Sequence, residues 1–579
     1  MYYNRLSRRV ALTFVAIVLL LLGVPALAAD GDVLVTNGSP SSPFAQNKQN
    51  EPGVAVNPSD PSVVVAGSND EIDLEACNAG DQTTCPFTAG VGLSGVYFSF
   101  DGGQSGSQPT YSGLTARDCL GPAACTPHVG DIGTLPLYFE NGLMSNGDPS
   151  LAFGPKPGAD GRFSWSNGAR LYYANLAGNL STSRDERAFK GFIAIAVSRT
   201  DDVAAAAAGG NSGKNAWMSP VIVSSRMSST TFSDKENIWV DNAASSPNFG
   251  NAYVCWVSFR SNGQHGAPEP LMVSRSTNGG DTWSGPKQVT QAANSVGVGG
   301  RQGCTMRTDS LGTLYVFWEG SDPSTKQSVQ FMSRSFDGGN SFERPIAVAT
   351  VVDVGKLDPV QGRLTIDGVA GARTDSFPSV DIANGAPTGA NAPNTIVMTW
   401  SDARNGLNHE EALVQVSTDG GNSWSAPINA AASGDRPDFP AVAISPDGQD
   451  VYLTYDAFLN PWRDNTSDVR NMQGVVRFAS GSDPSTWSTL HRGATGDARG
   501  SSANSLTSEF LGDYNYIAAT NDFSVAVWND TRDAAVCPAI NAFRQSIVDD
   551  SPIAPPAPNA DCPATFGNSD IFGGRFTAP

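Results

Sequence analysis

Residues 417–424, STDGGNSW, combine two adjacent glycines, an acid and hydroxyl residues with a large terminal aromatic ring. Nearly the same string recurs at 276–283 (STNGGDTW) and 335–342 (SFDGGNSF), and a degenerate copy, SFDGGQSG, occupies 99–106. An Asp or Asn side chain can accept hydrogen bonds from backbone amides of its own turn, and glycine takes positive φ without a Cβ clash. The ring can then pack on the adjoining sheet. The string therefore predicts a structural turn between two strands, and we do not expect its residues to be catalytic.

Seven stretches of the chain share the pattern of a β-hairpin. Each has a short strand with alternating apolar residues, a turn rich in Asn, Asp, Pro or Gly, and a second, more apolar strand. The hairpins begin at Glu51, Asp148, Glu236, Gln302, Phe377, Phe439 and Gly512. In three repeats a third strand, the glycine turn and a Pro-led fourth strand follow. Four antiparallel strands repeated around an axis are typical of a β-propeller.

The two ends of the chain complement each other in this pattern. The last hairpin lacks one strand, whereas residues 31–38, GDVLVTNG, form a strand-like segment with no hairpin of its own. We therefore predict an all-β, seven-bladed propeller, closed where the N-terminal strand joins the last blade. Six blades with an accessory hairpin are the alternative. The repeats are longer than compact blades need, which predicts long loops such as 203–217.

The first residues have the layout of a secretory signal peptide. Arg5, Arg8 and Arg9 precede an apolar run at 10–24 that is short for a bilayer span, and small residues at 26–28 form a cleavage site. We predict a signal peptide over 1–28 and a single β-propeller domain over 29–579, secreted and monomeric. Retention of the apolar run as a membrane anchor is the alternative.

The composition excludes several partners. The formal net charge is −20, which argues against nucleic acid and anionic membranes and favours solubility or cation binding. Only 16% of residues are charged, and the chain has 61 glycines and 38 prolines. This is the composition of a turn-rich extracellular all-β protein.

Eight cysteines in an exported chain predict disulfides. The simplest pairing joins Cys77 to Cys85, Cys119 to Cys125, Cys255 to Cys304, and Cys537 to Cys562; the alternative is that one or more pairs stay reduced. The sequence has no CxxC or HExxH motif and its four histidines are scattered, so zinc is not expected. No cofactor is predicted, although an acid-rich channel is also able to hold structural Ca²⁺ through its oxygens.

The glycine turns carry a family resemblance. The pattern S-x-D/N-x-G-x-[ST]-[WF] resembles the Asp-box, or BNR repeat, of the sialidase (neuraminidase) superfamily. The resemblance implies a secreted β-propeller glycosidase, an exo-α-sialidase-like hydrolase with a carbohydrate or glycoconjugate partner. It also implies that three arginines bind the carboxylate of the substrate. A Tyr activated by a Glu would be the nucleophile, and an Asp would be the acid/base. The family's Arg-Ile-Pro motif has no counterpart in this chain; the nearest string, 342–345, lies beside an Asp-box.

Propeller topology localises the predicted site. The first strand of each blade lines the central channel, so charged residues at first-strand starts and second-strand ends should meet at one axial mouth. We predict Tyr514 as nucleophile, Glu509 as its activating base, and Asp234 or Asp148 as acid/base. Arginine binds carboxylates bidentately. The predicted substrate-binding residues are Arg301, Arg436, Arg532, Arg404, Lys235 and Glu51. The alternative is that such residues only join blades, as inter-blade pairs Asp402–Arg404 and Asp530–Arg532.

Three functions are compatible with these patterns. The first is a secreted exo-acting glycoside hydrolase of sialidase type that cleaves terminal acidic sugars. The second is a non-catalytic extracellular propeller that binds glycan or protein, and it predicts an arginine-poor mouth or arginines that are all consumed in inter-blade pairs. The third is a lyase or endo-acting polysaccharide hydrolase, which predicts an open groove with paired carboxylates.

Overall fold

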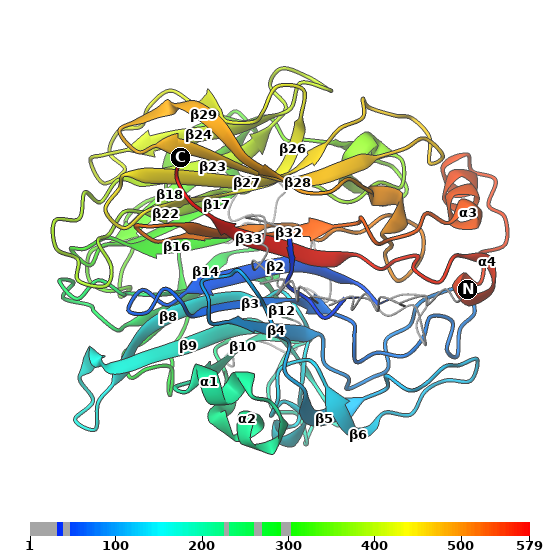
Figure 1. Cartoon of the computed structure of the whole chain (residues 1–579), viewed down its shortest axis with the longest axis horizontal. Coiled ribbons are helices and arrows are strands. Elements are labelled where there is room, and N and C mark those ends of the chain that lie inside the picture. Colours follow the sequence, from blue (N-terminus) through cyan, green and yellow to red (C-terminus); the bar gives the residue numbers. More distant parts are fainter. Residues whose placement is uncertain (1–31, 39–46, 225–230, 260–268, 291–302, 323) are drawn as a thin grey trace, which may run out of the picture.

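The structure is a computed structural model that describes residues 32–38, 47–224, 231–259, 269–290, 303–322 and 324–579. Each of the seven predicted hairpins forms an antiparallel strand pair. Helices are few and short (Figure 1), so the fold is all-β, as predicted. The predicted signal peptide, 1–28, lies outside the described residues.

The strands fall into four sets by their place in each unit. The first strands are β2 (Gln49–Val56), β8 (Ser150–Pro157), β12 (Phe232–Val240), β16 (Cys304–Thr308), β22 (Ser379–Ile382), β26 (Arg436–Ile444) and β31 (Tyr516–Ala519). The second strands are β3 (Val64–Asp70), β9 (Phe163–Asn179), β13 (Ala252–Phe259), β17 (Leu314–Ser321), β23 (Ile396–Asp402), β27 (Asp450–Phe458) and β32 (Ser524–Asp530). The third strands are β4 (Ser94–Ser99), β10 (Ile193–Thr200), β14 (Leu271–Ser276), β18 (Ser328–Ser335), β24 (Glu411–Ser417), β28 (Asn471–Ser480) and β33 (Asp570–Phe576). The fourth strands are β11 (Trp217–Ile222), β15 (Lys287–Gln288), β19 (Ile346–Val351), β25 (Ile428–Asn429), β29 (Asp483–Arg492) and, from the N-terminal segment, β1 (Val33–Leu34).

The remaining elements decorate these units. The extra strands are β5 (Tyr111–Thr115), β6 (His128–Ile132), β7 (Leu143–Ser145), β20 (Lys356–Asp358), β21 (Arg363–Thr365) and β30 (Gly496–Asp497). The helices are η1 (Phe139–Asn141), α1 (Val203–Ala207), α2 (Gly210–Ala216), η2 (Ile366–Gly368), η3 (Ala498–Gly500), α3 (Pro538–Val548) and α4 (Pro558–Asp561). In Figure 1, α1 and α2 lie at one edge of the molecule and α3 and α4 at another.

The first strands contact one another in chain order. β2 contacts β8, β8 contacts β12, and the series continues through β16, β22 and β26 to β31. β31 in turn contacts β2, so the last unit lies beside the first. The starts of all these strands are thereby brought to one region.

The N-terminal strand joins the last sheet. β1 pairs antiparallel with β33, with Val33 opposite Gly573 and Leu34 opposite Phe572. The sheet order is β1-β33-β32-β31. The predicted pairing of the N-terminal segment with the last hairpin is therefore confirmed.

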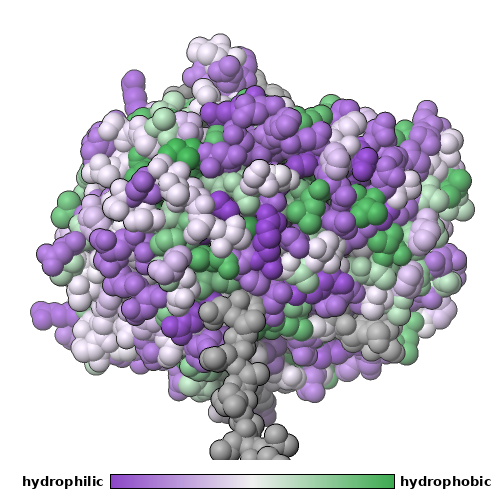
Figure 2. Space-filling view, turned by 45° about the horizontal axis from the view of Figure 1, so that its top comes forward, coloured by the Kyte–Doolittle hydropathy of each residue, from purple (hydrophilic) through white to green (hydrophobic). Residues whose placement is uncertain are grey.

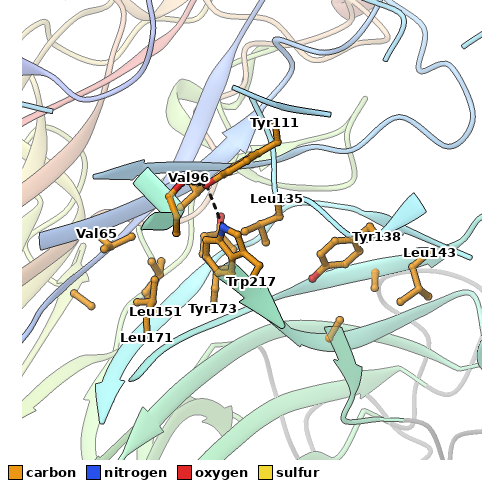
Figure 3. Packing of buried hydrophobic residues seen from close by; sticks show 14 of the residues in the cluster. Val65, Val96, Tyr111, Leu135, Tyr138, Leu143, Leu151, Leu171, Tyr173 and Trp217 are labelled. Carbon is orange, nitrogen blue, oxygen red and sulfur yellow. Dashed lines mark hydrogen bonds between the residues drawn. The ribbon is translucent and has the colours of Figure 1, made fainter. Parts of the chain in front are cut away.

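The hydrophobic core lies between neighbouring units. Figure 3 shows one such cluster, in which Val65 and Val96 of the first unit pack with Leu151 and Tyr173 of the second. Trp217 belongs to the same cluster, and its Nε1 donates a hydrogen bond to the hydroxyl of buried Tyr111 at 3.1 Å. Full burial of a large apolar side chain contributes about 1.5–3 kcal/mol. These shared clusters hold the units together.

The glycine turns have the predicted structure. In the turn after β24, Ser417 Oγ accepts a hydrogen bond from Gly421 N at 2.9 Å and donates one to Asp419 Oδ1 at 2.9 Å. Asp419 Oδ1 also accepts from Ser423 N at 2.9 Å. Gly420 and Gly421 have φ of 71° and 81°, which a residue with a Cβ adopts only under strain. The Ser and Asp or Asn of the turns after β14 and β18 form equivalent bonds.

An arginine ties each of these turns to the preceding unit. Arg170 Nη1 donates to Gly279 O at 2.7 Å, Arg275 Nη1 to Gly338 O at 2.8 Å, and Arg334 Nη1 to Gly420 O at 2.7 Å. The terminal aromatics Trp283, Phe342 and Trp424 pack against core clusters that also contain residues of the preceding unit. The turn is thus a structural link both within and between units.

Segment 203–217 differs from the predicted loop. It contains α1 and α2, and β11 begins at Trp217. Asp202 accepts a hydrogen bond from Ala205 N at 2.9 Å and caps α1. Alanine has the highest helix propensity, so the run at 204–208 favours a helix once a cap is present.

The four predicted disulfides are confirmed: Cys77–Cys85, Cys119–Cys125, Cys255–Cys304 and Cys537–Cys562. Among the described residues, no helix is long and apolar enough to cross a membrane. On the face shown in Figure 2, apolar residues form small separate groups among hydrophilic ones.

Candidate active site

Backbone bulges shape the starts of several first strands. Glu51, Asp148, Lys235 and Phe439 have φ of 54°, 53°, 56° and 51°. The strand register shifts beside three of them, between residues 50 and 53, 234 and 237, and 438 and 441. A bulge re-aims side chains, and a non-glycine residue in the left-handed region costs about 1–3 kcal/mol. The same strained geometry recurs in different units, so the fold imposes it where the first strands begin.

These bulges bring charged side chains together, and we call this region the mouth. Lys235 Nζ forms an ion pair with Asp513, and lies 3.4 Å from Asp148 Oδ2 and 3.6 Å from Glu51 Oε1. Arg373 Nη2 lies 2.8 Å from Glu51 Oε1 and 2.6 Å from Asp513 Oδ2. The side chains of Glu51 and Lys235 are 1% and 4% exposed. Groups from the first, second, third and last hairpins therefore meet in one buried network.

The network separates the pKa values of its carboxyl groups. Burial, with a contribution from Asp148, raises the pKa of Glu51 to about 8, against the opposing effect of Lys235. Burial also opposes ionisation of Asp513, but Arg373 and Lys235 outweigh it and lower the pKa of this carboxyl below its ordinary value. Asp513 is therefore ionised at neutral pH, whereas Glu51 retains a proton over much of the neutral range.

A cavity of about 70 Å³ opens beside this network, and we call it the mouth cavity. Its carboxyl groups are those of Glu236, Asp375 and Asp513. Its aromatic side chains are those of Phe377, Phe439, Tyr514 and Tyr516. Lys235, Arg307 and Cys304 also line it. Small-ligand sites also have aromatic walls and a few polar groups, but at about 70 Å³ this cavity is smaller than such sites usually are.

Glu236 has an unusual position in this cavity. The residue is 8% exposed, and neither of its carboxyl oxygens has a hydrogen-bond partner among the described residues. Burial, then Asp148 and Asp234, raise its pKa well above the ordinary value. Burial therefore favours the neutral, proton-bearing form of Glu236 over the carboxylate.

The structure places two predicted catalytic residues in different surroundings. Tyr514 lines the mouth cavity, and Lys235 Nζ lies 5.8 Å from the centroid of its ring. Burial, followed by Asp148 and Glu51, raises the pKa of Tyr514 well above its ordinary value, which favours the neutral phenol. Glu509 forms an ion pair with Arg470 at 2.6 Å between Nη1 and Oε1, and its side chain is 1% exposed.

The predicted acid/base residues both border the network. Asp148 faces Lys235, and its backbone N donates to Asn69 Oδ1 at 2.6 Å. Asp234 Oδ1 accepts a hydrogen bond from Lys235 N at 2.8 Å. Burial raises the pKa of both carboxyl groups, and Lys235 opposes that effect in each.

The predicted arginines that the structure describes all bind carboxylates. Arg436 Nη2 lies 3.1 Å from Asp367 Oδ1 and 3.2 Å from Glu410 Oε1. Arg404 binds Asp402 through two contacts of 2.8 Å. Arg301 lies outside the described residues. The Asp402–Arg404 pair itself lies within one strand end, but Arg404 Nη2 also donates to Thr350 O in β19 of the preceding unit at 3.1 Å, so this residue does join two units.

Arg532 follows the same local pattern. Its Nε lies 3.0 Å from Asp530 Oδ1 and its Nη2 lies 2.7 Å from Asp530 Oδ2. Nη2 also contacts Asp32 Oδ1 at 3.0 Å, beside β1 of the same sheet. The suggested inter-blade pair Asp530–Arg532 is therefore local too. A D-x-R string lets the guanidinium fold back onto the carboxylate, and Asp497–Arg499 shows the same geometry.

Three mouth residues were absent from the predicted catalytic and substrate-binding set: Glu236, Arg373 and Asp513. Asp513 directly precedes the predicted Tyr514. Glu236 directly follows Lys235, so its position was signalled by the same strand start. Arg373 precedes β22 and supplies the second cation of the network. Its place at a first-strand start indicated the mouth, but its partners Glu51 and Asp513 are distant in the sequence and were not predicted.

A second cavity, of about 210 Å³, is lined by first-strand residues of all seven hairpins. Arg307 and Tyr516 line both cavities. Arg307 Nε donates to Asp381 Oδ1 at 2.9 Å, and its guanidinium lies 4.5 Å from the centroid of the Trp239 ring. Within the described ranges, no group of three or more His, Cys, Asp and Glu is arranged to hold a metal ion. The Ca²⁺ alternative stays a prediction.

No known protein family matches the sequence, and no curated protein matches it. Among solved structures, a Hadza microbial sialidase is 11% identical with a TM-score of 0.37, over 71% of this chain and 63% of the sialidase. The phage phi92 endosialidase is 11% identical with a TM-score of 0.39, over 95% of this chain and 69% of the endosialidase. A GH93 alpha-L-arabinofuranosidase of Fusarium graminearum is 14% identical with a TM-score of 0.32, over 59% of this chain and 92% of the enzyme. The chain thus spans less than two thirds of the length of the sialidase, and these likenesses assign it no activity.

Proposed function

We propose that the protein is an extracellular glycan-active β-propeller whose functional site is the mouth. The proposed propeller has seven blades, one for each hairpin. Two observations support this arrangement: the first strands contact one another in chain order, and β31 returns to β2. The pairing of β1 with β33 supplies the fourth strand of the last blade. Four disulfides fit the proposed export of the chain.

The proposed activity is glycoside hydrolysis, and one observation carries it. The mouth cavity is lined by two carboxyl groups whose pKa values are displaced in opposite directions, Glu236 upward and Asp513 downward. A neutral acid and an ionised carboxylate are the pair that most glycosidases use. The aromatic walls supply surfaces on which the apolar face of a sugar ring can stack.

Each residue then has a stated role. Glu236 donates its proton to the glycosidic oxygen as the bond to the anomeric carbon breaks. The Asp513 carboxylate faces the positive charge that develops on the sugar. Water supplies the new hydroxyl group, and its remaining proton returns to the Glu236 carboxylate. Lys235 and Arg373 keep Asp513 ionised and fixed. Tyr514 contacts the ligand through its ring, although its role as nucleophile remains the alternative within this proposal.

The sialidase form of the proposal, cleavage of a terminal acidic sugar, requires arginine donors that are free to bind a carboxylate. Arg404, Arg436 and Arg532 each bind protein carboxylates. This observation favours a second candidate function, a non-catalytic propeller that binds glycan or protein. The mouth cavity would then be a recognition site with the same lining.

Hydrolysis of a panel of chromogenic acidic, neutral and amino glycosides by the full chain separates these candidates. We expect Glu236→Gln to lower kcat/KM about 10²–10⁴-fold, because the general acid is removed. Tyr514→Phe distinguishes a tyrosine nucleophile, which would lose activity, from a ring that only contacts ligand. The exposed Glu186→Gln is the matched control and should keep the wild-type rate. Absence of turnover across the panel would favour the binding function.

A further inference from the structure

Arg373 holds Asp513 through two contacts. Its Nε lies 2.6 Å from Oδ1 and its Nη2 lies 2.6 Å from Oδ2, and Nη2 also lies 2.8 Å from Glu51 Oε1. Burial opposes ionisation of Asp513, and the charge of Arg373, followed by those of Lys235 and Arg363, lowers the pKa of this carboxyl. The ionised state of Asp513 therefore depends on the orientation of the Arg373 guanidinium.

The ring of Phe510 lies against the same guanidinium. Arg373 Cζ is 4.6 Å from the centroid of this partly buried ring, and Lys48 Nζ is 5.7 Å from the same centroid. An aromatic ring attracts a cation within about 6 Å of its centroid, and the attraction grows when water is excluded. The side chain of Arg373 is only 13% exposed. Its contacts to Asp513 use the edge of the guanidinium, which leaves the flat face available to a ring.

The backbone that carries Phe510 is itself fixed. Phe510 N donates a hydrogen bond to Ser501 Oγ at 3.1 Å. Gly512, which directly precedes Asp513, has a φ of 82°, and a Cβ at this position would lie 2.1 Å from Cγ of Glu51. Only glycine therefore allows the chain to pass Glu51 this closely. The ring and the carboxylate belong to one short segment whose position is set on both sides of Phe510.

We propose that Phe510 is a positioning residue of the mouth, whose ring holds the Arg373 guanidinium in the orientation that makes both contacts to Asp513. The purpose of this orientation rests on the proposed function, in which an ionised and fixed Asp513 faces the charge that develops on the sugar. An aliphatic side chain at position 510 fills much of the same space without attracting the cation. Arg373 is then free to turn, and Asp513 loses one of its two contacts. Phe510 acts through Arg373 and not on the sugar.

A double-mutant cycle in urea denaturation of the full chain tests the contact without reference to activity. We expect Phe510→Leu to change the unfolding equilibrium constant about fivefold more in the wild type than in the Arg373→Met background, since one desolvated contact between a cation and a ring is worth about that factor. Phe510→Tyr keeps a ring and should behave as the wild type. Phe478→Leu, which alters a partly buried ring of β28 that packs on Tyr452, is the control and should show no coupling to Arg373. Equal effects of Phe510→Leu in the two backgrounds would overturn the inference.

Kinetics then separates positioning from folding. On a glycoside that the wild-type chain hydrolyses, Phe510→Leu should lower kcat about tenfold with KM little changed, because Asp513 acts on the charge that develops in the transition state. Phe510→Tyr should keep the wild-type kcat. A change in KM alone, or a tyrosine variant as slow as the leucine variant, would overturn the inference.

A crystal structure of Phe510→Leu decides if Arg373→Met fails to fold. Loss of one of the two contacts between Arg373 and Asp513 would support the inference, and retention of both would overturn it. Coupling between Phe510 and Arg373 without hydrolysis of any glycoside would sustain the positioning of Arg373 and refute the proposed hydrolase. Hydrolysis without this coupling would do the reverse.

Discussion

The glycine turns and the mouth use the same residue types for opposite purposes. At the turns, Asp337 and Asp419 accept hydrogen bonds from neighbouring serines and backbone amides, which lower their pKa values to about 2. At the mouth, burial raises the pKa of Glu51 to about 8, and it does the same for Asp438, which directly precedes the bulged Phe439 of the mouth cavity. Local partners in water stabilise the ionised acid, whereas burial among distant partners disfavours it. The acids of the turns are thus stabilised by their local hydrogen bonds, whereas Glu51 and Asp438 at the mouth have the raised pKa values expected of a functional site.

The largest expected effect comes from removing the cation at the centre of the mouth. Lys235→Met leaves Asp513, Asp148 and Glu51 buried without their shared partner, which should lower the free energy of unfolding by about 3–5 kcal/mol. Urea denaturation measures the change. Lys190→Met, at an exposed position, is the control and should stay within about 0.5 kcal/mol. Equal effects of the two variants would contradict the buried network.

The second expected effect is a dependence of stability on pH. Burial, with Asp375 and Glu410 contributing, raises the pKa of Asp438 to about 8. In the unfolded chain this group ionises near pH 4, so between about pH 4 and 8 only the folded state keeps the proton. Stability therefore falls as pH rises through this window, by up to about 1.4 kcal/mol per pH unit for one such group.

Asp438→Asn isolates that contribution, because the amide keeps the shape of the carboxylic acid and cannot ionise. Urea midpoints measured between pH 5 and 8 should decline less steeply in the variant than in the wild type. Asp160→Asn, whose side chain is 64% exposed in the wild type, should leave the slope unchanged. If Asp438→Asn did not change the slope of the urea midpoint against pH, the pKa of Asp438 would not be raised by burial, and its contrast with the lowered pKa values at the turns would be lost.

The smallest expected effect lies at the turns. Ser417→Ala removes the hydroxyl that binds Gly421 N and Asp419, and should cost about 1 kcal/mol of unfolding free energy. Glycoside hydrolysis and ligand binding should not change, because Ser417 lies at the end of its sheet opposite the starts of the first strands. If Ser417→Ala lost activity while its free energy of unfolding stayed at the wild-type value, the turn would have a functional role that we assign only to the mouth.

The sequence predicts the fold better than the site, for a physical reason. Hairpins, glycine turns and the 8-residue separation of Cys77 from Cys85 are local patterns, so each can be recognised without knowing the rest of the chain. The pairing of β1 with β33 was predictable because one strand was missing and one was surplus. Topology also indicated that Glu51, Asp148 and Lys235 would meet.

The partners of individual charges could not be predicted in this way. Arg532 and Arg404 bind acids two residues away, a local signal that the D-x-R string does carry. Glu509 instead forms an ion pair with Arg470, which belongs to another unit, and no local pattern indicates this pairing. The neutral state of Glu236 depends on burial and on a missing partner, and neither is visible before the chain is folded.

The protonation of Glu236 tests the account most directly. Infrared difference spectra of wild type minus Glu236→Gln at pH 7 report the carbonyl stretch of a protonated carboxyl group. The account predicts a protonated-carboxyl band that Glu236→Gln removes and Glu186→Gln retains. A carboxylate signal from Glu236 at pH 7 in the free protein would contradict the central claim that the mouth cavity holds a neutral acid.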